Sequence, residues 1–391
     1  MCLALMGIGV VPASAQVARD SAGVAVRMYT VETKPGQQWQ LERTPVLVIG
    51  GPGSTGREEF AGIRGVARLD NGAVVVADAG SMELRLFNEK GEFVRAFGRR
   101  GSGPGEFEGI GQVTRAGDTL IVSDFQDRLH LWRPDGTLLK TLARAPVGTL
   151  PNPKWMGRLT GGRDVFVGTP AMFQPWNGTT TVEAPIVLRT SPTTTTAIAT
   201  IPVFEVANVG GRQMPVYLGP AARLAIGERN ICAAWTKMWQ VTCFDDAGKP
   251  RWRTSRATTP APLAEADKEA FRESFRRANR HNGPPERVEA IVRSFAFGME
   301  RPPISRIELS RVGDVWVGPY VLQEETQLGQ VGLPVPDRGT TWSVLDRNGA
   351  WRADIDLPPR FRLVEAGSDY VAGVLRDADD VESVVVYRIR R

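Results

Sequence analysis

Five arginines recur near the start of the stretches that we interpret as the innermost strands of a repeated β unit. They are Arg64, Arg158, Arg223, Arg306 and Arg362. A guanidinium group offers paired donors to a carboxylate or a phosphate, so converging arginines would bind an anionic ligand. The alignment slips by a residue or two, and one alternative is that some of these side chains lie between neighbouring units. In a chain rich in arginine, coincidence is the other alternative.

The residues that most enzymes use are scarce. The chain has two histidines, His130 inside a predicted strand and His281 at the end of a predicted helix. Neither belongs to a nucleophile motif or has a metal-ligand spacing. The Gly-x-Ser-x-Gly and phosphate-loop fingerprints are also missing. We therefore expect no catalytic residues, no metal ligands and no cofactor.

Two cysteines flank a predicted hairpin. Cys232 and Cys243 lie in Ile231–Trp235 and Trp239–Cys243, on either side of a turn centred near Lys237. Directly opposed residues on adjacent strands meet the Cα separation that a disulfide needs, about 4.4–6.8 Å. A disulfide and a pair of small buried thiols both fit this pattern.

A repeat supplies the elements that must position these residues. Segments that start at Gly65 and Gly111 each contain four short apolar or alternating stretches separated by turn residues. The turns Asn88–Gly91 and Arg133–Gly136 end in glycine, which allows the positive φ that such turns need. Four strands per unit of about 45 residues are typical of β-propeller blades.

Two motifs of these units resemble those of a known family. The linker Phe97–Phe107 and the strand–turn–strand pattern Val76–Phe87 resemble the inter-blade linker and blade core of NHL-repeat propellers. In that family an Asp ends the second strand and an Arg opens the third. Asp78 and Asp124 match the Asp, and Arg128 matches the Arg, whereas the first unit has Glu83 there. The resemblance implies that both aspartates satisfy backbone groups of the turn.

Weaker copies of the unit continue to the end of the chain. Their strands are Val165–Val167, Ile186–Leu188, Ile231–Trp235, Gln240–Phe244, Val315–Val317, Trp342–Leu345, Phe361–Glu365, Tyr370–Val374 and Ser383–Ile389. The last unit ends one strand short, and residues 45–49 supply an apolar strand that would close the ring and hide its edges. We therefore predict an all-β fold in which residues 45–391 form a single six-bladed β-propeller of four-stranded blades. The pattern resembles exported bacterial six-bladed propellers.

Three inserts interrupt the repeat. Residues 169–184 and 319–340 separate second from third strands, and residues 255–303 separate units four and five. The last insert has apolar residues at helical spacing on both sides of a Gly-Pro-Pro break, which predicts a helical pair. By topology all three inserts decorate one face, around the channel mouth where the arginines start. Loops on a rigid scaffold often bind ligands, although these could merely cover a flat surface.

The beginning of the chain indicates export. Residues 1–15 are apolar and end in Ala13-Ser14-Ala15, which resembles a signal peptide whose basic start is missing. Residues 16–44 would then be an N-terminal extension of a periplasmic or secreted protein. No later stretch reaches the roughly 20 apolar residues of a membrane helix. A net charge of +5 over 391 residues does not indicate nucleic-acid binding.

Two functional classes remain. The first is a binding module for a protein, peptide, glycan or anionic small molecule. The second is a metal-dependent hydrolase or lyase like the lactonase-type or strictosidine-synthase-like propellers, which hold a cation or their reactive groups in the channel. A hard cation prefers carboxylates from several inner strands. The sequence places mainly arginine there, and Asp70 and Glu365 form no obvious cluster, so binding is our first hypothesis.

Overall fold

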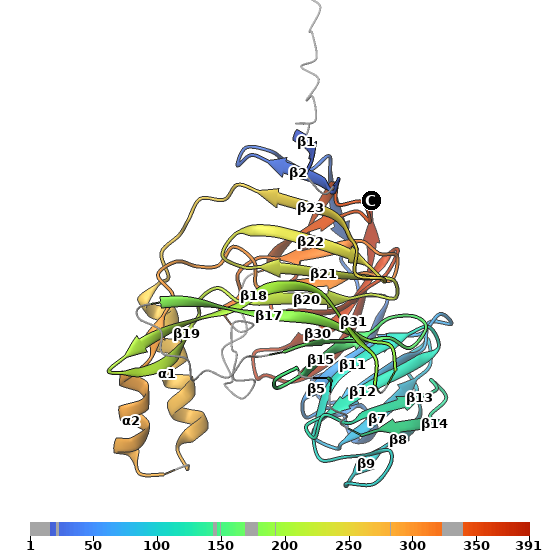
Figure 1. The fold of residues 1–391 in the computed structure, drawn as a ribbon. Coiled ribbons are helices and arrows are strands. Elements are labelled where there is room, and N and C mark those ends of the chain that lie inside the picture. Colours follow the sequence, from blue (N-terminus) through green and yellow to red (C-terminus); the bar gives the residue numbers. More distant parts are fainter. Residues whose placement is uncertain are drawn as a thin grey trace, which may run out of the picture.

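A computed structural model describes most of the chain, namely residues 16–20, 23–143, 147–148, 150–168, 179–191, 193–281, 283–322 and 339–391. The described part is mostly β-strand, with two α-helices and one short 3-10 turn. This confirms the prediction of a mainly β chain (Figure 1). Neither helix of the described part is long and apolar enough to cross a membrane. The predicted signal peptide lies outside the described residues.

Sheets I and II are regular four-stranded antiparallel meanders. Sheet I contains β5 (Ile63–Arg68), β6 (Val74–Asp78), β7 (Glu83–Phe87) and β8 (Phe93–Phe97). Sheet II contains β11 (Ile110–Ala116), β12 (Thr119–Asp124), β13 (Leu129–Trp132) and β14 (Leu138–Leu142). The linker between them includes the short parallel pair β9 (Arg99–Arg100) and β10 (Glu106–Phe107). The second and third strands that the repeat predicts in these two units lie within the observed strands; they are Val74–Ala77, Leu84–Phe87, Leu120–Ser123 and Leu129–Trp132.

Sheets III and IV are longer. Sheet III contains β15 (Lys154–Arg158), β16 (Asp164–Val167), β17 (Thr179–Arg189), β18 (Thr195–Val209), β19 (Arg212–Tyr217) and β24 (Ala296–Phe297). Sheet IV contains β20 (Ala222–Ile226), β21 (Asn230–Trp235), β22 (Trp239–Asp245), β23 (Pro250–Arg256), β2 (Ala25–Tyr29) and β1 (Gln16–Arg19). The prediction of an insert over residues 169–184 was wrong for its last six residues, because 179–184 pair with β18. Its remainder lies outside the described residues, as do residues 323–338 of the insert 319–340.

Sheets V and VI are joined into one nine-stranded sheet. Sheet V contains β25 (Arg306–Leu309), β26 (Val315–Gly318), β27 (Thr340–Leu345) and β28 (Trp351–Leu357). Sheet VI contains β29 (Phe361–Ala366), β30 (Tyr370–Arg376), β31 (Glu382–Arg390) and β4 (Leu47–Gly50). Between them, β3 (Gln37–Leu41) pairs with β28 in parallel and with β31 antiparallel. The N-terminal extension thus contributes strands to the sheets, which the sequence did not reveal.

The first strands lie side by side in five pairs of successive sheets. Contacts join β5 with β11, β15 with β20, β20 with β25, β25 with β29, and β29 with β5. Apolar clusters fill the spaces between neighbouring sheets; one of them packs Leu47 and Ile49 of β4 with Val74 of β6 and Val374 of β30. The core is therefore divided into layers between sheets (Figure 1).

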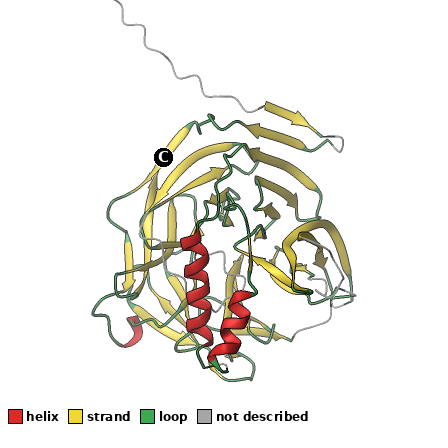
Figure 2. Cartoon of the chain, turned by 90° about the vertical axis from the view of Figure 1, so that its left-hand side faces the viewer, coloured by secondary structure: helices red, strands yellow, loops and turns green. Residues whose placement is uncertain are grey.

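The insert 255–303 holds the helices α1 (Glu265–Asn279) and α2 (Pro285–Arg293). The two helices lie against each other (Figure 2). Phe271 of α1 is fully buried, and its ring centroid lies 5.0 Å from that of Tyr217 on β19. The helical pair is therefore anchored by aromatic packing on the extended edge of sheet III.

The aspartates of the NHL-like motif organise turns. The Asp78 carboxylate accepts hydrogen bonds from the backbone of Ala61 and Ser81, and from Arg85 at 3.2 Å. Asp124 accepts from the Arg128 backbone at 2.8 Å and from its guanidinium at 2.6 Å. In sheet I the arginine that bonds to Asp78 is therefore Arg85, which lies two residues after Glu83.

Cys232 and Cys243 lie directly opposite each other in the hairpin β21–β22, with their Cα atoms 4.1 Å apart, and a disulfide joins them. Both side chains are buried. The bond connects the two central strands of sheet IV.

Loss of this disulfide should destabilise the fold, because the bond restricts the unfolded chain over a separation of 11 residues. For the double variant Cys232→Ala/Cys243→Ala we expect the free energy of unfolding to fall by about 2–3 kcal/mol in denaturant titrations. Cys2→Ser is the matched control and should leave the unfolding curve unchanged. Equal stability of the double variant and the unchanged chain would contradict the bond.

Candidate functional site

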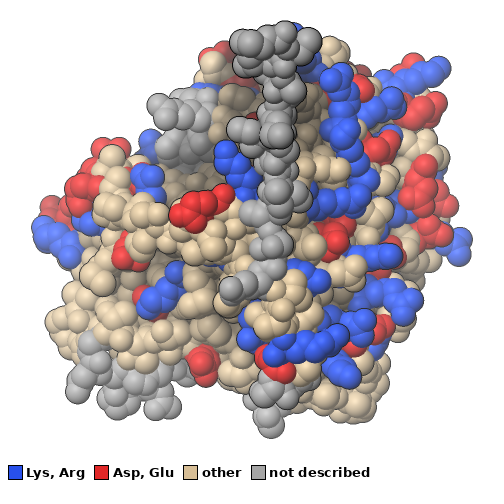
Figure 3. Space-filling model, turned by 90° about the horizontal axis from the view of Figure 1, so that it is seen from above, with Lys and Arg blue, Asp and Glu red and all other residues tan. Residues whose placement is uncertain are grey.

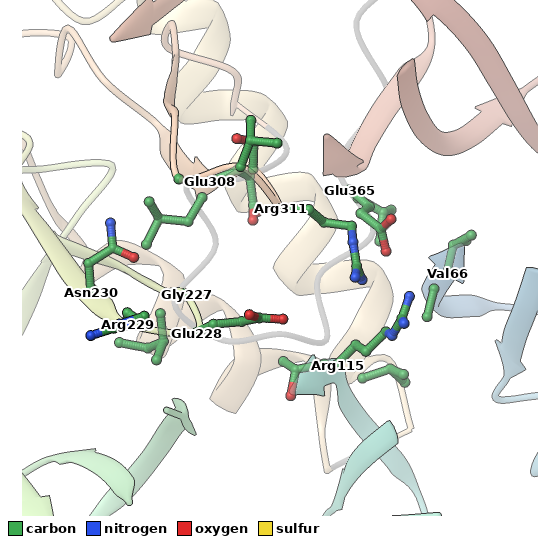
Figure 4. Close-up of a pocket in the computed structure, with 18 residues that line it drawn as sticks. Val66, Arg115, Gly227, Glu228, Arg229, Asn230, Glu308, Arg311 and Glu365 are labelled. Atoms are coloured by element: carbon green, nitrogen blue, oxygen red, sulfur yellow. The ribbon is translucent and has the colours of Figure 1, made fainter. Parts of the chain in front are cut away.

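A cavity of about 310 Å³ lies where the first strands of five sheets end (Figure 4). The lining residues belong to these strand ends and to the turns that follow them: Val66, Ala67, Val113, Thr114, Arg115, Ile226, Gly227, Glu228, Arg229, Asn230, Glu308, Leu309, Ser310, Arg311, Val312, Gly313, Val364 and Glu365. The helical insert leads into the start of β25, whereas the cavity is lined by the end of β25. The cavity therefore lies at the opposite end of the first strands from the helices.

Arg115, the next-to-last residue of β11, is a fixed part of the wall. Its guanidinium donates from Nε to the Gly117 carbonyl at 2.7 Å and from Nη1 to the Arg68 carbonyl at 3.0 Å. It also binds the two carboxylate oxygens of Asp70 at 3.1 and 3.0 Å. The side chain is only 6% exposed. Arg115 therefore positions its neighbours and has little capacity left for a ligand.

Asp70, in the turn after β5, joins two arginines of different sheets. Besides Arg115 of sheet II, it accepts a hydrogen bond at 3.2 Å from Nη2 of Arg311, in the turn after β25. The hydrogen bond and charge of Arg115 lower the pKa of Asp70 below its ordinary value. The carboxylate thus stays ionised and holds the Arg311 side chain at the cavity.

Glu365 of β29 supplies a buried acid beside this pair. The Tyr370 hydroxyl donates to its Oε1, and the Arg68 backbone N–H donates to its Oε2 at 3.2 Å. Burial raises the pKa of Glu365, although the neighbouring arginines oppose the shift. Burial and the adjacent carboxylate also raise the pKa of Tyr370. Both shifts disfavour the charged forms of these two groups in the folded protein.

Glu228 faces this wall from the other side. It lies in the turn between β20 and β21, which a hydrogen bond from Gly227 N to Asn230 O closes at 2.9 Å. The Glu228 carbonyl also accepts from the Thr160 backbone at 2.7 Å, so sheet III supports this turn. In Figure 4 its carboxylate extends into the cavity toward Arg311 and Arg115. The cavity thus has a cationic wall and an opposing anionic group.

The five arginines predicted to form an anion-binding ring are all in the described part of the chain, and none of them lines this cavity. Arg223 donates to the Ser305 carbonyl, just before β25, and Arg362 donates to the Ile63 carbonyl of β5 at 2.8 Å. These two therefore tie the start of one first strand to the start of the next. Arg306 forms an ion pair with Glu308, and Arg64 is exposed.

The prediction that Arg158 stands near a strand start was wrong. The strand begins at Lys154, and Arg158 is its last residue. Its guanidinium forms a two-point ion pair with Asp164 of β16, at 2.8 and 2.9 Å. Asp164 also accepts from Arg189 at 3.1 Å, so Arg158 belongs to a polar cluster along sheet III.

Sequence reasoning missed the residues of the cavity. It separated Asp70 from Glu365, although Arg311 pairs with the first and influences the pKa of the second. The available signal was that four units carry a charged residue at or just after the end of the first strand, at Asp70, Arg115, Glu228 and Arg311. Charged residues are so common in turns that this signal was not distinctive.

Among the described residues, no group of three or more His, Cys, Asp or Glu side chains lies close enough together to hold a metal ion. Over the face seen in Figure 3, basic and acidic side chains are interspersed. The small positive net charge is therefore not gathered into one continuous basic patch there.

No family model and no curated protein match this sequence. Among solved structures, the chain is similar to a member of the DUF4221 family from Bacteroides vulgatus, with a TM-score of 0.53 and 9% identity over 90% of this chain and 99% of that one. A protein described as exported, from Bacteroides fragilis, has a TM-score of 0.48 and 14% identity, covering 94% and 100%. A gluconolactonase from Xanthomonas campestris has a TM-score of 0.42 and 10% identity, covering 89% and 99%.

At these identities the similarity concerns the fold and not the activity. The matches include exported proteins and β-propellers of the gluconolactonase type. Of the three, the protein from Bacteroides vulgatus is the one whose TM-score is high enough to support a shared fold.

The buried Glu365 gives a testable pH dependence. Since its pKa is raised in the folded state, the stability linked to Glu365 is fully present below its ordinary pKa and is lost as the pH rises through the folded-state pKa. The variant Glu365→Gln cannot ionise. Its melting temperature relative to the unchanged chain should therefore increase between about pH 4 and about pH 8.

The matched control is Glu89→Gln, which replaces an exposed glutamate in the β7–β8 turn. Its melting temperature should run parallel to that of the unchanged chain. Parallel pH profiles for Glu365→Gln would show that this carboxyl is not perturbed in the fold.

Proposed function

We propose that this chain is an exported six-bladed β-propeller that binds a small anionic ligand in the cavity at the ends of its first strands. In this proposal sheets I to VI are the blades. The contacts between first strands and the apolar layers between neighbouring sheets support a ring, in which each blade packs on both faces.

The proposed ring closes through β4. This strand pairs with β31 over Leu47–Gly50 and gives sheet VI its fourth strand. Sheet VI then contacts sheet I through β29 and β5. Strands from both ends of the chain thus share one sheet, which protects the edge that β31 would otherwise expose.

The proposed binding function rests on the Arg311 side chain. Within the part of the chain that the structure describes, its guanidinium has one hydrogen bond, to Asp70, and its side chain is 26% exposed. In Figure 4 this group points into the cavity. Its remaining donors suit a carboxylate or a phosphate. The volume of about 310 Å³ lies at the lower end of the range for small-molecule pockets.

The disulfide supports the proposed export. Disulfides persist in the periplasm and outside the cell and are rare in the reducing cytosol. The bond between Cys232 and Cys243 is therefore in keeping with a periplasmic or secreted protein.

The binding function is tested by melting and calorimetric titration against small carboxylates, phosphate, sugars and divalent metals, each with and without chelator. A ligand that binds the folded state raises the melting temperature. We expect a carboxylate or phosphate to bind, and Arg311→Gln to weaken its affinity by about 10- to 100-fold, the value of a hydrogen bond to a charged group.

Two further variants test where the ligand binds. Arg100→Gln replaces an exposed arginine of β9 and should leave affinity unchanged. Arg223→Gln removes one arginine at the opposite end of the first strands. If Arg223→Gln abolishes binding while Arg311→Gln does not, the ligand site is the arginine ring instead. A shift with Ca²⁺ that chelator reverses would favour the metal-dependent hydrolase.

A further inference from the structure

The cavity contains two opposed charged groups, and the fold pairs only one of them, Arg311, through its single contact with Asp70. Glu228 and Arg311 face each other in Figure 4, yet no ion pair joins Glu228 to any cation of the described residues. The two groups come from sheet IV and sheet V, and the turn of Glu228 is fixed by backbone hydrogen bonds. Open space in the cavity therefore separates a carboxylate from a guanidinium.

Neighbouring groups do not fill this gap. The guanidinium donors of Arg115 already form hydrogen bonds with Gly117, Arg68 and Asp70. Glu308 is paired with Arg306. Glu365 receives hydrogen bonds from Tyr370 and from the Arg68 backbone. The groups left to contact a ligand by charge are Arg311 and Glu228, with Arg229 at the rim.

A simple anion satisfies only half of this arrangement. A carboxylate on Arg311 would also approach Glu228, and like charges in a partly desolvated cavity repel. A ligand that carries a cation as well would pair with Glu228 at the same time. Charges that leave water are best accommodated in pairs, so the double pairing favours such a ligand over a plain acid.

We infer that the ligand is a small zwitterion of the free amino acid or short peptide class, whose carboxylate binds Arg311 and whose ammonium group binds Glu228. This inference rests on the proposed function, since it names the ligand class of the same cavity. The Asn230 amide, which also lines the cavity, offers both a donor and an acceptor to the peptide backbone.

Three matched ligand sets test this inference. A mixed dipeptide library is compared with its N-acetylated form, which lacks the ammonium group, and with its C-amidated form, which lacks the carboxylate. We expect the free dipeptides to raise the melting temperature most, and each blocked form to bind at least 10-fold more weakly in calorimetric titration.

Single-residue variants test which side chain binds each end of the ligand. Glu228→Gln should remove the discrimination against N-acetylated dipeptides, and Arg311→Gln should remove that against C-amidated dipeptides. Glu89→Gln and Arg100→Gln are the matched charge controls and should preserve both preferences.

The outcomes separate this inference from the proposed function. N-acetylated dipeptides or simple carboxylates could bind as tightly as free dipeptides, with an affinity that Arg311→Gln reduces. In that case the proposed anion-binding function stands, and the inference of a zwitterionic ligand is wrong. If neither dipeptides nor any anion of the panel binds in a way that depends on Arg311, the proposed function itself fails.

Discussion

Each sheet of this protein must bury both of its faces, and this constraint shapes the rest of the molecule. The strands Val74–Asp78 and Asp164–Val167 are buried along their whole length, so sheets I and III are covered on both faces at these strands. Apolar layers between the sheets satisfy this requirement. A sheet at the end of a linear stack would keep one face exposed, and the contacts of sheet VI with sheet I avoid that outcome.

The same constraint creates the cavity. Packing the sheets face to face brings the ends of their first strands together, and the turns that follow these strands then meet around one opening. The network around Asp70 draws on sheet I for Asp70, on sheet II for Arg115 and on sheet V for Arg311, while Glu365 comes from sheet VI. No single sheet contains this site, which exists only when sheets distant in sequence are assembled.

Sequence alone revealed the elements that are rich in apolar β-forming residues and bounded by turns, such as Val74–Asp78 and Leu129–Trp132, and the helical pair in residues 255–303. It did not reveal β2 and β3, because each is a short strand stabilised by pairing with residues more than 200 positions away, nor β1, which in turn pairs with β2. Arg158 was misplaced because Gly157 produces an irregular register in its strand, which hides where that strand begins. Arg311 and Glu228 were missed because their turns look ordinary until assembly brings them together.

The decisive experiment is a crystal structure of the protein grown with a free dipeptide. We expect one dipeptide in the cavity, with its carboxylate on the Arg311 guanidinium, its ammonium group on the Glu228 carboxylate, and Asp70 still bound to both arginines. An empty cavity, with the ligand instead at the opposite end of the first strands beside Arg223 and Arg362, would contradict it.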